Sequence, residues 1–142
     1  MRKLIVSMNV TLDGFMSGPQ CELDWHFRSW TSEMAESLCA ELNEADTIVL
    51  GRTTYVAMAQ YWPLKALDPT FPREDLVFVD MMNSYTKIVI SKTLPATSWS
   101  NSRLVKGRLA NEIRRLKLYP GKNMMIYGSG KLVKALIRLG LV

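Results

Sequence analysis

The chain has 142 residues, 48% of them hydrophobic, and a formal net charge of +5. That length fits one domain, spanning residues 1–142, with an ordinary core and no need for a disulfide framework. Two cysteines, Cys21 and Cys39, and one histidine, His26, make a metal site unexpected. No apolar run approaches the roughly 20 residues of a membrane span, and no secretory signal is evident. We therefore expect a soluble, cytoplasmic protein without a membrane partner.

The positive charge favours an anionic partner without identifying it. The lysines and arginines are scattered along the sequence, and their one local cluster, Arg114, Arg115 and Lys117, is typical of a solvated helix face. A nucleic-acid surface usually shows a concentrated basic stripe with interleaved aromatic residues. We therefore expect no nucleic-acid partner, whereas mild positive charge would suit a small phosphorylated ligand.

The apolar pattern alternates between strand-like and helix-like segments. In chain order it predicts a strand at 3–8, a helix at 31–43, a strand at 46–50, a helix at about 54–60, strands at 87–90 and 103–105, a helix at 108–118, a strand at 123–127 and a helix at 131–139. Residues 76–82 are ambiguous between helix and strand, and 64–75 carry prolines typical of an irregular segment. A long loop follows the first strand. The alternation predicts an α/β fold with a mostly parallel sheet and helices on both of its faces.

Three of the predicted strands end in residues that can bind phosphate. In an open α/β sheet, ligands collect at these carboxyl ends. Gly51, Arg52, Thr53 and Thr54 join a strand to a helix and could bind phosphate through helix amides, hydroxyls and a guanidinium. The alternative is that Thr53 merely caps the helix and that Arg52 is an ordinary surface charge.

Of the other two strand ends, one carries a cation and the other carries a glycine turn. Ser91-Lys92 places a hydroxyl beside an ammonium, which suits a phosphate monoester such as the 2′-phosphate of NADPH. Gly128-Ser129-Gly130 allows close backbone approach and precedes a helix, whose positive end suits a pyrophosphate. This turn is shorter than a dinucleotide fingerprint and is not a Walker A loop, so a simple tight turn is the alternative. One dinucleotide could bridge all three ends.

Candidates for the substrate side lie early in the chain. Asp24 could place a carboxylate beside a bound heterocycle and anchor or help to protonate it, although a solvated turn residue is the alternative. Four aromatic residues could line a pocket for a flat ring, although aromatic residues are more often core or rim. They are Trp25, Trp30, Tyr61 and Trp62.

These segments together resemble the dihydrofolate reductase superfamily, and more closely the bacterial branch related to the reductase domain of riboflavin biosynthesis. The matching segments occur in the expected order along almost the whole chain. They are Lys3-Leu4-Ile5-Val6-Ser7-Met8-Asn9-Val10-Thr11-Leu12-Asp13-Gly14-Phe15, Asp24-Trp25, Val49-Leu50-Gly51-Arg52-Thr53-Thr54-Tyr55, Tyr61-Trp62-Pro63, Lys87-Ile88-Val89-Ile90-Ser91-Lys92-Thr93-Leu94, Pro120-Gly121-Lys122 and Gly128-Ser129-Gly130-Lys131-Leu132-Val133.

The resemblance implies an NADPH-dependent reductase of a pyrimidine- or pterin-type substrate. A ribosylamino-pyrimidine of riboflavin biosynthesis is the first choice and dihydrofolate the second. It assigns the pyrophosphate to Arg52, Thr53 and Thr54 beside Gly51, and the 2′-phosphate to Ser91 and Lys92. A second phosphate-binding turn would be Gly128, Ser129, Gly130, Lys131 and Leu132. The loop at 9–16, with Val10 and Gly14, would close over the nicotinamide, and Asp24 would be the catalytic acid.

The resemblance also implies a departure at the end of the chain. Family members continue beyond the position of Val142 with further strands, so we expect those C-terminal strands to be missing and a sheet edge to be open. A homodimer could cover that edge. A non-catalytic nucleotide-binding module of the same fold is the alternative to an enzyme.

Overall fold

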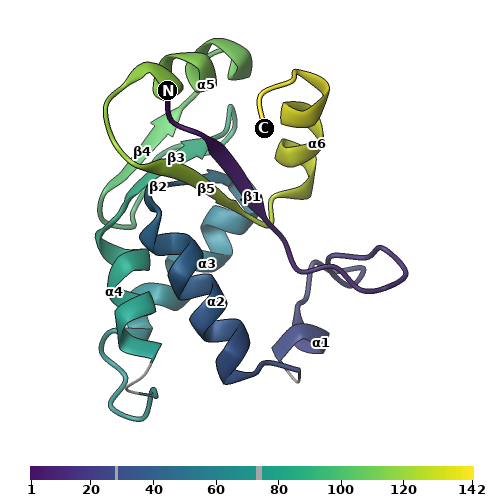
Figure 1. Ribbon diagram of the computed structural model, residues 1–142, viewed down its shortest axis with the longest axis vertical. Helices are drawn as coiled ribbons and strands as arrows, with labels where there is room; N and C mark the ends of the chain where they lie inside the picture. Colours follow the sequence, from purple (N-terminus) through teal and green to yellow (C-terminus); the bar gives the residue numbers. More distant parts are fainter. Residues whose placement is uncertain (28, 73–74) are drawn as a thin grey trace.

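A computed structural model describes residues 1–27, 29–72 and 75–142 (Figure 1). Strands and helices alternate along most of the chain. They are β1 (Leu4–Ser7), α1 (Asp24–Phe27), α2 (Ser32–Asn43), β2 (Ala45–Gly51), α3 (Arg52–Lys65), α4 (Leu76–Ser84), β3 (Thr86–Ile90), β4 (Ser102–Val105), α5 (Leu109–Leu118), β5 (Asn123–Tyr127) and α6 (Gly130–Arg138).

The strands form one sheet in the order β1-β5-β2-β3-β4, and every pair of neighbours is parallel. Val49 in the central strand β2 pairs with Ile88 of β3 on one side and Ile126 of β5 on the other. All five strands therefore end at the same side of the sheet, which we call the carboxyl edge, and begin at the opposite amino edge.

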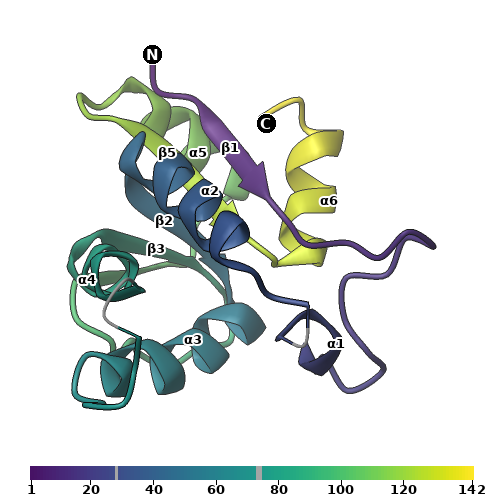
Figure 2. The ribbon, with the colours of Figure 1, turned by 60° about the horizontal axis from the view of Figure 1, so that its bottom comes forward.

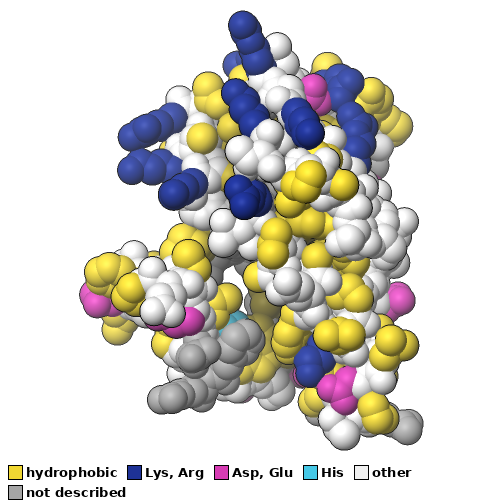
Figure 3. Space-filling model, turned by 180° about the vertical axis from the view of Figure 1, so that it is seen from behind, with side chains coloured by type: hydrophobic (Ala, Val, Ile, Leu, Met, Phe, Trp, Pro, Cys, Tyr) yellow, Lys and Arg dark blue, Asp and Glu magenta, His cyan; other side chains and the backbone are white. Residues whose placement is uncertain are grey.

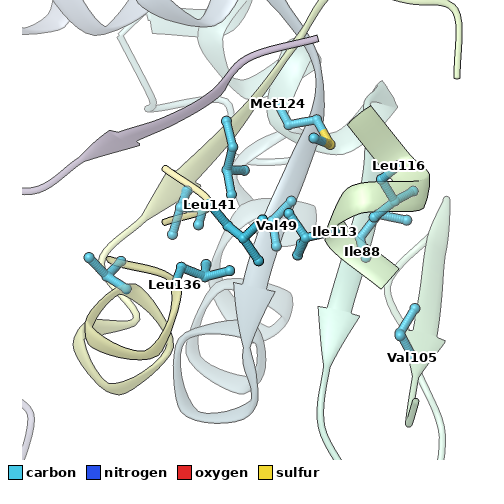
Figure 4. Close-up of a cluster of buried hydrophobic side chains, with 11 residues drawn as sticks. Val49, Ile88, Val105, Ile113, Leu116, Met124, Leu136 and Leu141 are labelled. Carbon is cyan, nitrogen blue, oxygen red and sulfur yellow. The ribbon is translucent and has the colours of Figure 1, made fainter. Parts of the chain in front are cut away.

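Helices cover both faces of the sheet, as Figure 2 shows. On one face α5 and α6 pack through Ile113, Leu116, Val133 and Leu136 against apolar side chains of the strands, and Leu141 joins this cluster (Figure 4). On the other face α2, α3 and α4 pack against the alternate side chains of the same strands, which include Ile48, Leu50 and Val89. The prediction of a mostly parallel α/β sheet with helices on both faces is confirmed.

The second cluster contains a fully buried lysine. Lys87 of β3 is 0% exposed, and its Nζ donates to the carbonyls of Met82 and Asn83 at 3.1 and 2.6 Å. These carbonyls belong to the last turn of α4, where backbone acceptors lack helical partners. The ammonium also lies 4.5 Å from the ring centroid of Trp99. Burial lowers the pKa of Lys87 to about 8.

The amino edge is held together by Arg2. Its guanidinium pairs with Asp46 and donates to Thr47 Oγ1 at 2.8 Å and to the Lys122 carbonyl at 2.5 Å. The Lys122 amide in turn donates to Asp46 Oδ2 at 2.8 Å. One side chain therefore links the segments that lead into β1 and β5 to the first residues of β2.

The structure corrects one predicted element, decides a second and adds a third. The helix expected at 54–60 is α3, which begins at Arg52 and continues past Pro63. It continues because Asn83 Nδ2 of α4 donates to the Trp62 carbonyl at 3.1 Å and Trp62 packs against Phe78, which holds the last turn despite the proline. The ambiguous segment 76–82 is helical, as α4. The four-residue α1 was not expected, because one turn is too short to show a helical period.

Candidate functional site

Two helices begin side by side at the carboxyl edge without side-chain caps. The N-cap of α3 is Gly51 and that of α6 is Ser129, and neither cap position makes a side-chain hydrogen bond to its helix. The reading of Thr53 as the helix cap is wrong, because Thr53 is the second residue of α3. The first amides and the positive dipole ends of both helices therefore remain for an anion.

A hydrogen bond joins these two helix starts. The Gly51 amide donates to Ser129 Oγ at 3.0 Å, and the Leu132 side chain packs close to Gly51. Gly128 and Ser129 both have left-handed backbone conformations, with φ of 58° and 56°. Glycine accepts this conformation freely, whereas serine adopts it at a cost. Thr54 lies beside Gly128, since a Cβ built there would be 3.8 Å from its hydroxyl oxygen.

The third strand end adjoins the first two through Arg52. Its Nη1 donates to Thr93 Oγ1 at 3.0 Å, in the turn that follows Ser91-Lys92. Ser91 is 8% exposed, and its Oγ accepts the amides of Thr93 and Leu94 at 3.2 and 3.0 Å. The Ser91 hydroxyl therefore shapes the turn, and the Lys92 side chain next to it is exposed.

The edge is electropositive. Arg52, Lys92 and Lys131 are all exposed there, and none of the ion pairs found among the described residues involves them. Their charges add to the positive ends of α3 and α6. The arrangement favours a ligand with several phosphate groups, because guanidinium, ammonium and backbone amides all donate to phosphate oxygens.

The first loop lies against the Gly128-Ser129-Gly130 turn. A Cβ built on Gly130 would be 2.5 Å from Met16 Sδ, so a side chain at that position would displace Met16. Thr11 holds the loop in a compact turn. Its amide donates to the Phe15 carbonyl and its hydroxyl donates to Asp13 Oδ1. The same hydroxyl accepts the Phe15 amide at 2.9 Å. The loop that was expected to close over a nicotinamide is therefore placed next to the second glycine turn.

A groove separates this loop from α6. It has a volume of about 410 Å³ and an apolar floor that includes Met8, Val10 and Val133, with Gly14 and Met16 on the loop side. Val10 is 51% exposed and Gly14 has a φ of 92°. Val10 and Gly14 thus face α6 across the groove, whereas Met16 makes the contact with the glycine turn.

A hydrogen bond connects the loop to α1. Asn9 Nδ2 donates to His26 Nε2 over 2.7 Å, and the His26 ring packs edge-on against Trp25 and Trp30, with centroids 5.8 and 4.9 Å away. Burial lowers the pKa of His26, which favours the neutral ring that can accept from Asn9.

Asp24 begins α1, but its side chain lies outside what the structure describes. The other two aromatic residues expected in a pocket, Tyr61 and Trp62, pack on each other beside α4.

Sequence reasoning assigned no individual role to three residues that organise this edge: Asn9, Met16 and Thr93. Each acts through one contact between segments far apart in the chain, and such contacts leave no periodic signal in the sequence.

In the described part of the chain, no three His, Cys, Asp or Glu side chains gather as a metal site requires. No described helix is long and apolar enough to cross a membrane.

Comparison with known proteins gives a consistent picture. The family model of the RibD C-terminal domain matches residues 2–142. YyaP, an uncharacterized protein of Bacillus subtilis, is 32% identical over 141 residues, which cover 99% of this chain and 70% of that protein.

The fold is also found in a crystal structure from Shewanella sp. PV-4, of a protein described as a candidate riboflavin biosynthesis protein. The TM-score is 0.66 at 20% identity, over 100% of this chain and 72% of the other. The predicted resemblance to the riboflavin-biosynthesis branch of the dihydrofolate reductase superfamily is confirmed. A family match across residues 2–142, together with the shared fold, shows that the chain belongs to the family of RibD C-terminal domains.

Proposed function

We propose that the protein is an NADPH-dependent reductase of a pyrimidine- or pterin-type heterocycle, with a ribosylamino-pyrimidine of riboflavin biosynthesis as the first candidate substrate. One observation supports the cofactor above all. The starts of α3 and α6 lie side by side at the carboxyl edge, tied by the 3.0 Å bond from Gly51 to Ser129, and neither has a side-chain cap. Such paired helix starts fit a pyrophosphate.

Different segments of the carboxyl edge would bind different phosphate groups of the cofactor. Arg52, Thr53 and Thr54 would hold the pyrophosphate from the α3 side. The segment 128–132 would approach it from the α6 side, where Gly128 leaves the space that a side chain would fill. Lys92, presented by the turn that Ser91 shapes, would contact the 2′-phosphate.

The substrate would lie where the first loop meets α1. When bound, the cofactor would supply the hydride for reduction of a C=N or C=O carbon. The chain's own contribution would be to align the ring and to exclude water, through the loop that Met16 and Asn9 hold in place. Asp24 at the start of α1 would anchor the heterocycle or deliver a proton.

The decisive experiment is a calorimetric titration of the protein with NADPH, followed by turnover assays with a ribosylamino-pyrimidine and with dihydrofolate. We expect saturable NADPH binding and oxidation of NADPH with the first substrate. Absence of binding at millimolar NADPH would overturn the proposal as a whole. Binding without turnover of either substrate would retain the cofactor site and refute the reductase.

A further inference from the structure

The last part of the chain carries most of the positive charge and almost none of the negative charge. Twelve of the eighteen Lys and Arg residues, but one of the thirteen acidic residues, fall within residues 87–142. That segment supplies α5 and α6, which form the helical layer on one face of the sheet. The opposite layer contains α2, which carries Glu33, Glu36 and Glu41. The two helical layers therefore differ in the sign of their charge.

The outward sides of α5 and α6 present the same combination of side chains. Arg114, Arg115 and Leu118 of α5 are exposed, and so are Lys134, Ile137 and Arg138 of α6. Within each set, residues three or four positions apart lie on one side of the helix. The opposite sides of the two helices face the core through Ile113, Leu116, Val133 and Leu136. We call these six exposed residues the basic face. Figure 3 shows Lys and Arg side chains gathered over this part of the molecule, with hydrophobic side chains between them.

The cations of the basic face are largely uncompensated. In the described part of the chain, Arg115 is the one member with a carboxylate at ion-pair distance, 2.6 Å from Glu112. Two large aliphatic side chains are exposed among them, since Leu118 is 76% and Ile137 62% exposed. Exposed aliphatic residues that lie among cations mark a surface for an interface with both anionic and apolar character.

The two halves of the basic face lie differently with respect to the candidate cofactor site: Lys134, Ile137 and Arg138 of α6 also line the groove that Val10 and Gly14 face, whereas the α5 half is not part of that groove. The helix α5 joins parallel strands and α6 begins at the carboxyl edge, so both run back toward the amino edge. Leu118 is the last residue of α5, and Ile137 and Arg138 are the last two of α6. A large partner on this face would therefore lie at the mouth of that groove, beside Gly130, while Gly51 and Lys92 are not among the residues that line the groove.

We propose that the basic face binds the surface of an anionic lipid bilayer, with its four cations against headgroup phosphates and with Leu118 and Ile137 in the interfacial region. The aliphatic pair distinguishes this partner from a nucleic acid, whose phosphate backbone offers little to leucine and isoleucine. None of the six residues is aromatic, and among α5, α6 and their caps one ring is exposed, that of Tyr119 at the C-cap of α5, which is too little for successive bases to stack on. The attachment is peripheral and depends on both charge and apolar insertion.

The test is sedimentation of the whole chain with vesicles, either of phosphatidylcholine mixed with phosphatidylglycerol or of phosphatidylcholine alone. We expect binding to the anionic vesicles, weakened by salt, and little binding to the neutral ones. The double variant Arg114→Gln/Lys134→Gln should bind on the order of twentyfold more weakly, since each cation near an anionic surface contributes about fivefold. The control Ser37→Glu/Gln60→Glu, which changes net charge equally on the other layer, should bind as the unaltered chain does.

A second pair of variants tests the apolar contribution. Leu118→Ser should weaken binding to anionic vesicles by on the order of tenfold, whereas Leu64→Ser, at a 66% exposed position of α3, should not. Thermal unfolding followed by circular dichroism shows whether each variant keeps its fold. The proposal is overturned if anionic vesicles are not bound, if the two charge variants lose binding equally, or if Leu118→Ser has no effect while duplex DNA is bound.

Discussion

Lys92 is the residue on which the proposed preference for NADPH depends. Its ammonium is exposed beside Arg52 at the end of β3, and the buried Ser91 hydroxyl holds the turn that presents it. We predict that Lys92→Ala weakens NADPH binding about tenfold, or 1.4 kcal/mol, because a charge-assisted hydrogen bond to the 2′-phosphate is lost. NADH binding should be unchanged, as measured by calorimetry. Lys3→Ala removes one exposed cation at the amino edge and serves as the control; equal losses in both variants would refute the assignment.

Lys87 makes stability depend on pH. Burial lowers its pKa to about 8 in the folded protein, from the ordinary lysine value of 10.5. The unfolded chain therefore binds more protons between these values, and the free energy of unfolding rises with pH across that window. We predict that the unaltered protein gains stability relative to Lys87→Met as pH rises from about 8 to about 10. Urea unfolding at several pH values measures this difference, and a constant difference would contradict it.

At the scale of elements, the first loop and the glycine turn fit together through one contact. Met16 lies so close to Gly130 that a methyl group there must displace it, although its thioether is flexible. Gly130→Ala is therefore expected to loosen the loop at 9–16 while it costs the fold less than about 1 kcal/mol. Faster amide exchange confined to this loop would show the loosening.

Met16→Ala provides the matched test of that contact. In a Met16→Ala background, Gly130→Ala should have no further effect on loop exchange, because the atom it would displace is absent. Additive effects of the two substitutions would mean that Gly130 acts through its helix rather than through Met16.

At the scale of the whole molecule, the amino edge of the sheet has a structural role and the carboxyl edge has the proposed binding role. Arg2 ties three segments together at the amino edge, whereas the candidate ligand residues lie at the carboxyl edge. We predict that Arg2→Met lowers the free energy of unfolding by about 1–3 kcal/mol, since it leaves polar partners unpaired. NADPH affinity of the folded variant should be unchanged. A joint loss of stability and affinity, measured by urea unfolding and by calorimetry at low temperature, would show that the edges are coupled.

Local patterns in the sequence were sufficient for most of the fold. The strand at 123–127 was predicted with its observed limits, because its apolar residues are consecutive and turn residues bound it. The helix predicted at 31–43 is α2, and Thr31 at its start is the N-cap, with its Oγ1 accepting the Met34 amide. The end of α3 and the helical state of α4 could not be read from the sequence, because Trp62, Phe78 and Asn83 stabilise each other across two elements.

The sequence by itself determined the alternation of strands and helices, and with it the parallel sheet and the three strand ends that we propose as the phosphate site. These features follow from apolar periods and turn residues, which act over a few neighbouring positions. The tertiary structure decided which contacts join those ends: the Gly51 amide on Ser129, Arg52 on Thr93, and Met16 on the glycine turn. It also placed the basic helices α5 and α6 in one layer on the same face of the sheet. Such features depend on residues far apart in the chain, and only the folded backbone brings them within reach.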